Sequence, residues 1–273
     1  MTRFWLLAIA LVRAAGADRV HRDLEFRRAG DVRLLLDLYL PESVKGPAPV
    51  IISIHGGGWH GGSKERSPGL DFTRFGYAVA SINYRLTGQA AFPAQIHDCK
   101  AGVRWLRANA RQYSLDPARF AAWGASAGGH LAALLGTSAG VAALEGDLGN
   151  LGESSRVQAV VDFFGPIDVA GWYRYKKDAF AALIGAPLAG NEERLMATDP
   201  RTYIDARDAP ALIAHGAADT LVPVEHSRML HEGLRRAGVF SDLRVIPEAG
   251  HSVTALNLEA EVRAFFDRHL RRE

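Results

Sequence analysis

Ser126 lies at the centre of the stretch Gly124-Ala-Ser-Ala-Gly128, where a strand-like pattern gives way to a helix-like pattern. A serine hydroxyl attacks a carbonyl carbon only when a neighbouring base removes its proton. Small neighbours permit the sharp, strained turn that holds such a serine out at the edge of a sheet. The spacing alone is weak evidence, because small residues recur by chance in a chain rich in alanine and glycine. Its position between a strand and a helix favours a nucleophile over an ordinary tight turn.

A second glycine-rich stretch, "HGGGW" at residues 55–59, follows the β-branched run at 50–54. Consecutive glycines let a loop turn its N–H groups inward without a Cβ clash. Acyl transfer needs such donors for the negative carbonyl oxygen of its intermediate, and losing one typically costs roughly 2.7–4 kcal/mol. The stretch lacks the Gly-Lys-Ser/Thr ending of a phosphate loop and the spacing of a dinucleotide fingerprint. Together the two motifs indicate acyl-transfer chemistry.

A base and an orienting acid stand at matching places further along the chain. Asp219 follows the apolar run at 211–216, and His251 follows the next strand-like run. Both are therefore expected at the same sheet edge as Ser126, the edge that carries the active site in open α/β sheets. The chain order serine, aspartate, histidine is that of an α/β-hydrolase.

Other acids and histidines compete for these roles. They are Asp205, Asp208 and Glu248 among the acids, and His55, His60 and His215 among the histidines. The first two acids precede their strand, and the third lies too close in sequence to His251. We expect His215 to cap a strand end and the other two histidines to support the glycine loop by hydrogen bonding. No His/Glu spacing suggests a catalytic zinc, so neither a metal nor a cofactor is predicted.

The elements that must position these residues alternate between buried strands and amphipathic helices. Two strands are expected around Gly30 and Asp31, and Cys99 is expected as a small core residue of a helix near 96–113. Further strands are expected near 50–54, 77–86, 115–124, 157–165, 211–216 and 241–251, and further helices near 68–75, 128–135, 224–238 and 257–272. This alternation predicts an α/β fold, with a mostly parallel sheet flanked by helices. We predict a single domain over 18–273, with a short insert or cap at about 165–200.

Composition narrows the class of protein further. The chain has 273 residues, of which 48% are hydrophobic and 23% charged, with a net charge of +2 and one cysteine. The mean hydropathy of -0.03 excludes a polytopic membrane protein. The sequence contains no basic block of the kind that would suggest nucleic acid as a partner. One cysteine permits no intramolecular disulfide. The sequence leaves the oligomeric state open.

The N-terminus resembles a secretory signal. Arg3 precedes an apolar run from Phe4 to Val12, and Ala15-Gly-Ala17 follows as a cleavage site. The run is too short for a stable membrane insertion, which needs about 20 residues. We therefore predict a signal peptide over 1–17 and a secreted or periplasmic protein, or a cytoplasmic one if this segment is not cleaved. A packed N-terminal helix is the alternative.

With these motifs in hand, the chain resembles the α/β-hydrolase superfamily, among the serine esterases with a His-Gly-Gly-Gly motif. It is similar in particular to the Bacteroidetes-type feruloyl and acetyl-xylan esterases, neighbours of the hormone-sensitive-lipase-like esterases. The likeness covers nearly all of the predicted domain. It rests on "HGGGWHGGSK", "SINYRL", "FPAQIHDCKAGVRWLRANA", "DPARFAAWGASAGGHLAALLG", "VVDFFGPID" and "PALIAHGAADTLVPVEHSRMLHEGLRRAG".

The resemblance implies a role for each matching residue. Ser126 becomes the nucleophile, His251 the base and Asp219 its orienting acid. The implied oxyanion-hole donors are Gly57, or alternatively Gly58, together with Ala127. Only about 20 residues of the predicted mature chain precede the end of the first strand pair, which we expect to be too few for an N-terminal helical cap, so we expect an open site.

Aromatic residues of the insert are candidates for the pocket wall. Trp172, Tyr173 and Tyr175 join Trp59 as candidate substrate-binding residues, with packing of the insert onto the body as the alternative. The predicted partner is a small-molecule ester, of a short-chain, acetyl or hydroxycinnamoyl acid. Two alternatives stay open: an amide hydrolase of the peptidase or formamidase type, and a non-catalytic binding module. The intact serine, acid, histidine and glycine loop argue against the second.

Overall fold

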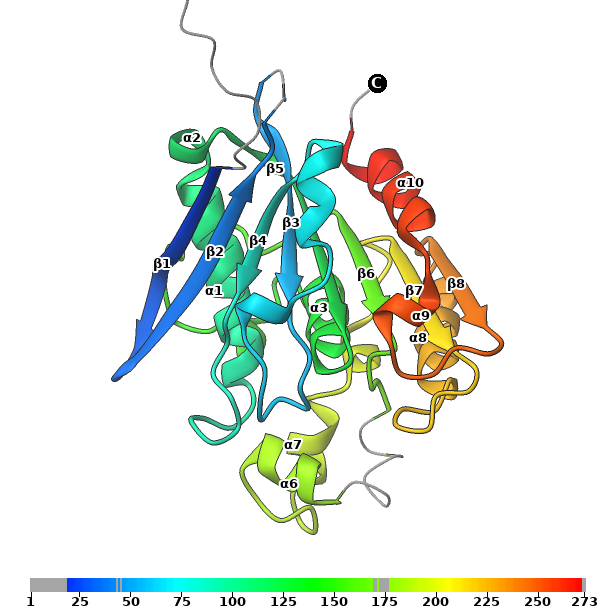
Figure 1. The fold of residues 1–273 in the computed structure, drawn as a ribbon. Coiled ribbons are helices and arrows are strands. Elements are labelled where there is room, and N and C mark those ends of the chain that lie inside the picture. Colours follow the sequence, from blue (N-terminus) through cyan, green and yellow to red (C-terminus); the bar gives the residue numbers. More distant parts are fainter. Residues whose placement is uncertain (1–18, 43, 45, 169–170, 172–176, 272–273) are drawn as a thin grey trace, which may run out of the picture.

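Eight strands form one sheet in the order β1-β2-β4-β3-β5-β6-β7-β8 (Figure 1). This computed structural model describes residues 19–271, except 43, 45, 169–170 and 172–176. The strands are β1 (Arg19–Ala29), β2 (Val32–Leu40), β3 (Ala48–Ile54), β4 (Ala78–Ile82), β5 (Leu115–Ala125), β6 (Ala159–Phe163), β7 (Ala211–Gly216) and β8 (Ser241–Ile246). The first two pair antiparallel, β2 is antiparallel to β4, and all later pairs are parallel.

Helices cover both faces of this sheet. The α-helices of the described residues are α1 (Ala94–Ala108), α2 (Ala110–Tyr113), α3 (Ala127–Thr137), α4 (Ala142–Glu145), α6 (Lys177–Ile184), α7 (Glu192–Met196), α8 (Glu225–Arg236), α9 (Val253–Leu256) and α10 (Glu259–Leu270). The described residues also form three short 3-10 helices, η1 (Lys64–Arg66), η2 (Leu70–Phe75) and η3 (Pro200–Tyr203). Helices α6 and α7 lie beyond the carboxyl ends of the central strands (Figure 1).

Successive side chains of a strand point to opposite faces of the sheet, and a separate hydrophobic core lies on each face. In β3, the side chains of Val50, Ile52 and Ile54 pack into one cluster with α1, α3 and α8. The intervening Ile51 packs into a second cluster with η2 and α10. Both faces of the strand are buried, which is why its sequence is apolar apart from Ser53 rather than alternating.

The carboxyl ends of neighbouring parallel strands finish in register. Ile54 of β3 pairs with Gly124 of β5, and Phe163 of β6 pairs with Ala214 of β7. The loops that follow these strands therefore leave the sheet from one edge. That edge receives the glycine loop, the serine turn and the segments that carry the acid and the histidine.

The structure confirms the predicted fold class and the order of its elements. Cys99 is fully buried on α1, as expected. The segment expected as a helix near 68–75 is the 3-10 helix η2. Among the described helices, none has the length and apolar character needed to cross a bilayer. The signal peptide at 1–17 and the pocket residues Trp172, Tyr173 and Tyr175 lie outside the described residues.

Candidate active site

Ser126 sits at the turn between β5 and α3 in a strained backbone conformation. Its φ is 57° and its ψ is -124°, a region that non-glycine residues rarely adopt. The surrounding chain holds it there: the Ser126 N–H donates to the Phe163 carbonyl at 2.9 Å, and the His130 N–H donates to the Ser126 carbonyl at 3.0 Å. These two hydrogen bonds tie the turn to the neighbouring strand β6 on one side and to the first turn of α3 on the other.

The two flanking glycines are required by close backbone contacts. A Cβ on Gly124 would lie 2.0 Å from the Gly128 carbonyl oxygen, and a Cβ on Gly128 would lie 2.1 Å from the Ile54 carbonyl oxygen. Neither gap admits even a methyl group, because real Cβ atoms do not approach backbone oxygen so closely. Gly124 is thus required by packing within the turn, and Gly128 by packing of the turn against β3.

Asp219 and His251 contact each other directly at the same sheet edge. Their closest atoms, Asp219 Oδ2 and His251 Nδ1, are 2.7 Å apart. The Asp219 side chain is fully buried, whereas the His251 side chain is 16% exposed. With Nδ1–H donating to the carboxylate, Nε2 of the neutral ring is left free to accept a proton.

The buried carboxylate of Asp219 is held in its charged form. Burial opposes ionisation, but the Val222 N–H, the His251 ring and the Leu221 N–H all donate to it, and together they lower the pKa of Asp219. The Asp219 Oδ1 atom accepts from these two amides at 3.0 and 2.8 Å. The other oxygen is thereby left to the ring of His251.

The glycine loop lines the pocket together with Ser126. Gly57 and Gly58 have φ values of +108° and +59°, which suit glycine. Among the described residues, no acceptor binds the amides of Gly57, Gly58 or Ala127. All three residues line the same pocket as Ser126. The free amide of Ala127 lies at the positive end of α3.

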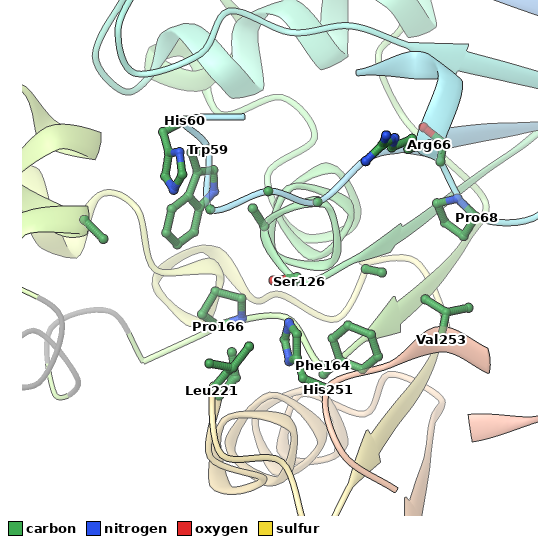
Figure 2. A pocket seen from close by; sticks show the side chains of 18 of the residues that line it. Trp59, His60, Arg66, Pro68, Ser126, Phe164, Pro166, Leu221, His251 and Val253 are labelled. Carbon is green, nitrogen blue, oxygen red and sulfur yellow. The ribbon is translucent and has the colours of Figure 1, made fainter. Parts of the chain in front are cut away.

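One pocket of about 740 Å³ encloses these groups (Figure 2). That volume lies within the range of small-molecule sites, about 300–1,000 Å³. Ser126 and His251 both line it. Within the described residues no hydrogen bond joins the Ser126 hydroxyl to the His251 ring, a contact that often tightens only when substrate binds.

Trp59 forms part of the pocket wall and is itself held by the protein. Its indole is only 3% exposed, and its Nε1–H donates to His130 Nδ1 at 3.2 Å. The other ring nitrogen of His130 contacts the Thr198 carbonyl at 2.7 Å, and burial lowers the pKa of His130 to about 4. The indole also packs near Phe180 of α6, with ring centroids 5.7 Å apart. Through these contacts, Trp59 connects the glycine loop to the segment between β6 and β7.

The three competing histidines behave differently from one another. His215 is buried between Ser227 Oγ at 2.7 Å and the Val222 carbonyl at 2.9 Å, the structural role expected. His55 contacts the Gly56 carbonyl through Nδ1 at 2.8 Å, which confirms its support of the loop. His60 supports the loop through its backbone N–H, which donates to the Gly57 carbonyl at 3.2 Å, whereas its exposed ring lines the pocket and bonds to none of the described residues.

The competing acids lie away from the pocket. Asp205 pairs with Arg207 at 2.6 Å, and Asp208 accepts from the Asp205 amide at 2.8 Å. Glu248 is exposed on the loop after β8. None of the three lines the pocket.

Several pocket residues were not singled out from the sequence. They are Arg66, Phe164, Pro166, Phe180, Leu221 and Val253. Phe164 follows β6 directly and its ring lies against His251, with centroids 4.3 Å apart. Its position directly after a parallel strand could have identified it from the sequence, because residues that follow parallel strands meet at one edge of the sheet. The other residues come from loops and helices that carry no comparable pattern.

Comparisons with known proteins agree with this architecture. The BD-FAE family model matches residues 36–234. Esterase LipQ of Mycobacterium tuberculosis is 31% identical over 240 residues, which cover 84% of this chain and 56% of LipQ. The chain spans less than two thirds of the length of this and two other curated relatives that it matches.

Two solved structures are also similar over most of the chain. A bifunctional GH43-CE protein of Bacteroides eggerthii has a TM-score of 0.86 and 36% identity, covering 93% of this chain and 36% of that one. A truncated carbohydrate esterase from gut microbiota has a TM-score of 0.84 and 31% identity, covering 93% and 97%. The site geometry, the matched span and these relatives lead to one assignment: the chain belongs to the BD-FAE family of α/β-hydrolases.

Proposed function

We propose that the protein hydrolyses carboxylic esters through a covalent acyl-enzyme formed on Ser126. The observation that carries this proposal is the pocket in which the strained Ser126 turn meets a His251 ring bonded to Asp219 at 2.7 Å. A serine, a base and an orienting acid at one site form the constellation of nucleophilic acyl transfer.

In the first half of the reaction, Ser126 Oγ attacks the ester carbonyl carbon and His251 Nε2 takes the hydroxyl proton. The resulting imidazolium is stabilised by the buried Asp219 carboxylate, which keeps the proton on Nδ1. The carbonyl oxygen becomes negative and accepts hydrogen bonds from the Ala127 amide and from the amide of Gly57 or Gly58. When the intermediate collapses, the bond to the alcohol oxygen breaks and His251 protonates that oxygen.

In the second half, water takes the place of the departed alcohol. His251 Nε2 removes a proton from this water as its oxygen attacks the acyl carbon. The same amides receive the negative oxygen, and collapse returns the proton to Ser126 Oγ. The products are one alcohol and one carboxylic acid, and the protein is regenerated.

The names of the relatives favour esters over amides. LipQ is named an esterase, and the gut microbiota structure is titled a carbohydrate esterase. The same constellation of residues can cleave amides, but neither of these names refers to that activity. Ester hydrolysis is therefore the function proposed.

We propose acetyl or hydroxycinnamoyl esters as the substrates. One side of the pocket supports this choice, because it is apolar and is formed by the Trp59 indole and the Phe180 ring. Flat apolar walls suit a small acyl group or an aromatic one. We also propose that the protein is exported to the cell exterior, where polymeric esters occur.

Hydrolysis of a graded ester series tests the function. The panel contains p-nitrophenyl esters from acetate to decanoate, methyl ferulate, and a p-nitroanilide matched to the acetate. We expect the wild-type protein to cleave acetate or ferulate faster than the anilide, and Ser126→Ala to be inactive. Equal rates for the wild-type protein and the variant across the panel would exclude Ser126 as nucleophile.

A further inference from the structure

Arg66 lines the pocket without an anionic partner of its own. It ends the 3-10 helix η1, is exposed, and its guanidinium makes no ion pair or hydrogen bond with any described residue. Figure 2 shows the guanidinium directed from the rim toward the middle of the pocket. An unpaired cation in this position is available to a ligand.

The other charges of η1 are already neutralised within the protein. Lys64 is buried and lies 2.8 Å from Asp37, 3.0 Å from Asp23 and 3.0 Å from Glu65. Hydrogen bonds from Ser63 and Lys64 lower the pKa of Glu65 to about 2. The carboxylate of Glu65 is thus held by its neighbours, and the positive charge of Arg66 is left without a counterion.

The backbone that carries Arg66 is fixed on both sides. Ser81 Oγ of β4 donates to the Lys64 carbonyl at 2.6 Å, and Ser53 Oγ of β3 donates to the Pro68 carbonyl at 2.5 Å. Both serines are fully buried. A side chain on such an anchored segment loses less freedom on binding than one on a mobile loop.

The pocket carries positive charge and is divided by Ser126. Among the described residues that line it, the ionisable ones are His60, Arg66 and His251, and none is a carboxylate. On one side of Ser126 lie Arg66, Pro68 and Val253, and on the other lie Trp59, Pro166 and Leu221 (Figure 2). A substrate that spans Ser126 therefore meets an apolar wall at one end and the Arg66 cation at the other.

We infer that the site prefers esters that carry a carboxylate, and that Arg66 binds this carboxylate on its side of the scissile bond. The inference rests on the proposed ester hydrolysis at Ser126 and adds the class of substrate. A guanidinium presents paired N–H donors that match the two oxygens of a carboxylate. The chemistry is the same whether the carboxylate belongs to the acyl group or to the alcohol.

Two matched pairs of esters test the inference and distinguish these two sources. The pair meta-acetoxybenzoate and meta-acetoxybenzamide places the charge on the leaving group. The pair p-nitrophenyl hydrogen succinate and p-nitrophenyl succinamate places it on the acyl group. For each pair we would measure the ratio of kcat/KM for the anionic ester to that for the neutral ester.

We expect Arg66→Gln to lower this ratio by about fivefold in one of the two ester pairs, mainly by raising KM for the anionic ester. Arg66→Lys should retain part of the preference, because it keeps the charge but loses the paired donors. Arg228→Gln is the matched control: Arg228 is exposed on α8 and does not line the pocket. That variant should leave both ratios unchanged, and added salt should weaken the preference of the wild-type protein.

Each outcome decides a different claim. Ratios that are the same in the wild-type protein and Arg66→Gln, with neutral esters still cleaved, would overturn the role of Arg66 alone. An equal fall in Arg228→Gln would also overturn it, since net charge rather than position would then set the preference. Failure of the wild-type protein to cleave any of the four esters would instead count against the proposed hydrolysis.

Discussion

At the scale of single residues, Asp219 lies within reach of two histidines whose environments differ. Its Oδ2 atom is 2.7 Å from His251 Nδ1 and 3.3 Å from His215 Nε2. His215 is fully buried, and burial lowers its pKa, so it stays neutral beside the carboxylate. His251 instead reaches the pocket. The same acid therefore contacts one ring that is buried in the protein and one ring that lines the pocket with Ser126.

Asp219→Asn should abolish most activity without disturbing the fold. The asparagine oxygen can still accept the Leu221 and Val222 amides, which places its NH₂ group against His251 Nδ1. His251 would then carry its proton on Nε2 and would no longer act as a base. We expect kcat for an aryl acetate to fall by about 10⁴-fold.

The matched control is Asp205→Asn, which alters an exposed carboxylate paired with Arg207 outside the pocket. This variant should stay within about twofold of the wild-type rate, as expected for a surface change away from the site. A loss of less than tenfold in Asp219→Asn would contradict the orienting role of this acid.

At the scale of elements, the junction of β5 and α3 depends on the close approach of β3. Gly128→Ala would place a Cβ 2.1 Å from the Ile54 carbonyl oxygen. We expect the free energy of unfolding to fall by about 3 kcal/mol or more, because neither backbone can move away without breaking the sheet. Denaturant unfolding of the variant and the wild-type protein measures the change.

Gly88→Ala provides the comparison for this prediction. Gly88 is exposed, and a Cβ there meets nothing within 4 Å. Its effect on unfolding should stay within about 0.5 kcal/mol. If both alanine variants were equally stable, the close contact at Gly128 would not be what requires a glycine.

The junction of β6 with α3 contains a buried acid that should make stability depend on pH. Asp162 is fully buried; its Oδ1 accepts from the Gly165 amide at 2.9 Å, and Oδ2 has no hydrogen-bond partner among the described residues. Burial raises the pKa of Asp162 to about 7, against the opposing effect of the Gly165 amide. The native state therefore keeps a proton that the unfolded chain releases near pH 4.

Because the unfolded state loses this proton first, the free energy of unfolding should fall as pH rises from about 4 to about 7, by up to ~1.4 kcal/mol per pH unit. Asp162→Asn removes the titrating group and should flatten this slope. Urea unfolding of both proteins at several pH values in this window measures the difference. Parallel slopes in the two proteins would show that Asp162 is already ionised in the native state.

Elements with strong local patterns were predictable from sequence, and long-range contacts were not. The run at 50–54 and the apolar face of α1, including Cys99, are specified locally and were predicted. Ser126, Asp219 and His251 were proposed from the sequence because each follows a strand or precedes a helix in a recognisable motif.

The unpredicted features depend on tertiary approach. Arg66 faces the pocket only because buried serines of β3 and β4 anchor its segment. The ring of His60 lines the pocket rather than bonding to the loop, a choice that local sequence does not encode. The orphaned oxygen of Asp162 likewise depends on how α3 packs against β6.

At the scale of the whole molecule, a buried ion pair joins the antiparallel part of the sheet to η1, the segment that carries Arg66. Asp37 of β2 is fully buried and lies 2.8 Å from Lys64 Nζ, and it also accepts from the Asp23 amide at 2.8 Å. Asp37→Ala would leave the buried ammonium with only partly exposed partners. We expect a loss of about 3 kcal/mol in the free energy of unfolding.

Glu25→Ala is the matched control on the neighbouring strand, where Glu25 pairs with Arg28 and Arg33 at the surface. Its cost should stay below about 1 kcal/mol, since exposed ion pairs contribute little. Similar losses in both variants, measured by denaturant unfolding, would mean that the Asp37 pair does not tie the edge to the rest of the molecule.

The most direct test of the proposed chemistry is to trap its covalent intermediate. The protein would be mixed with p-nitrophenyl acetate, quenched within the first turnovers, digested, and mapped by mass spectrometry, with Ser126→Ala treated in parallel. We expect a burst of nitrophenol and one acetyl group on the peptide that contains Ser126, with neither in the variant. Acetylation at another residue with turnover retained in Ser126→Ala would contradict nucleophilic catalysis by this serine.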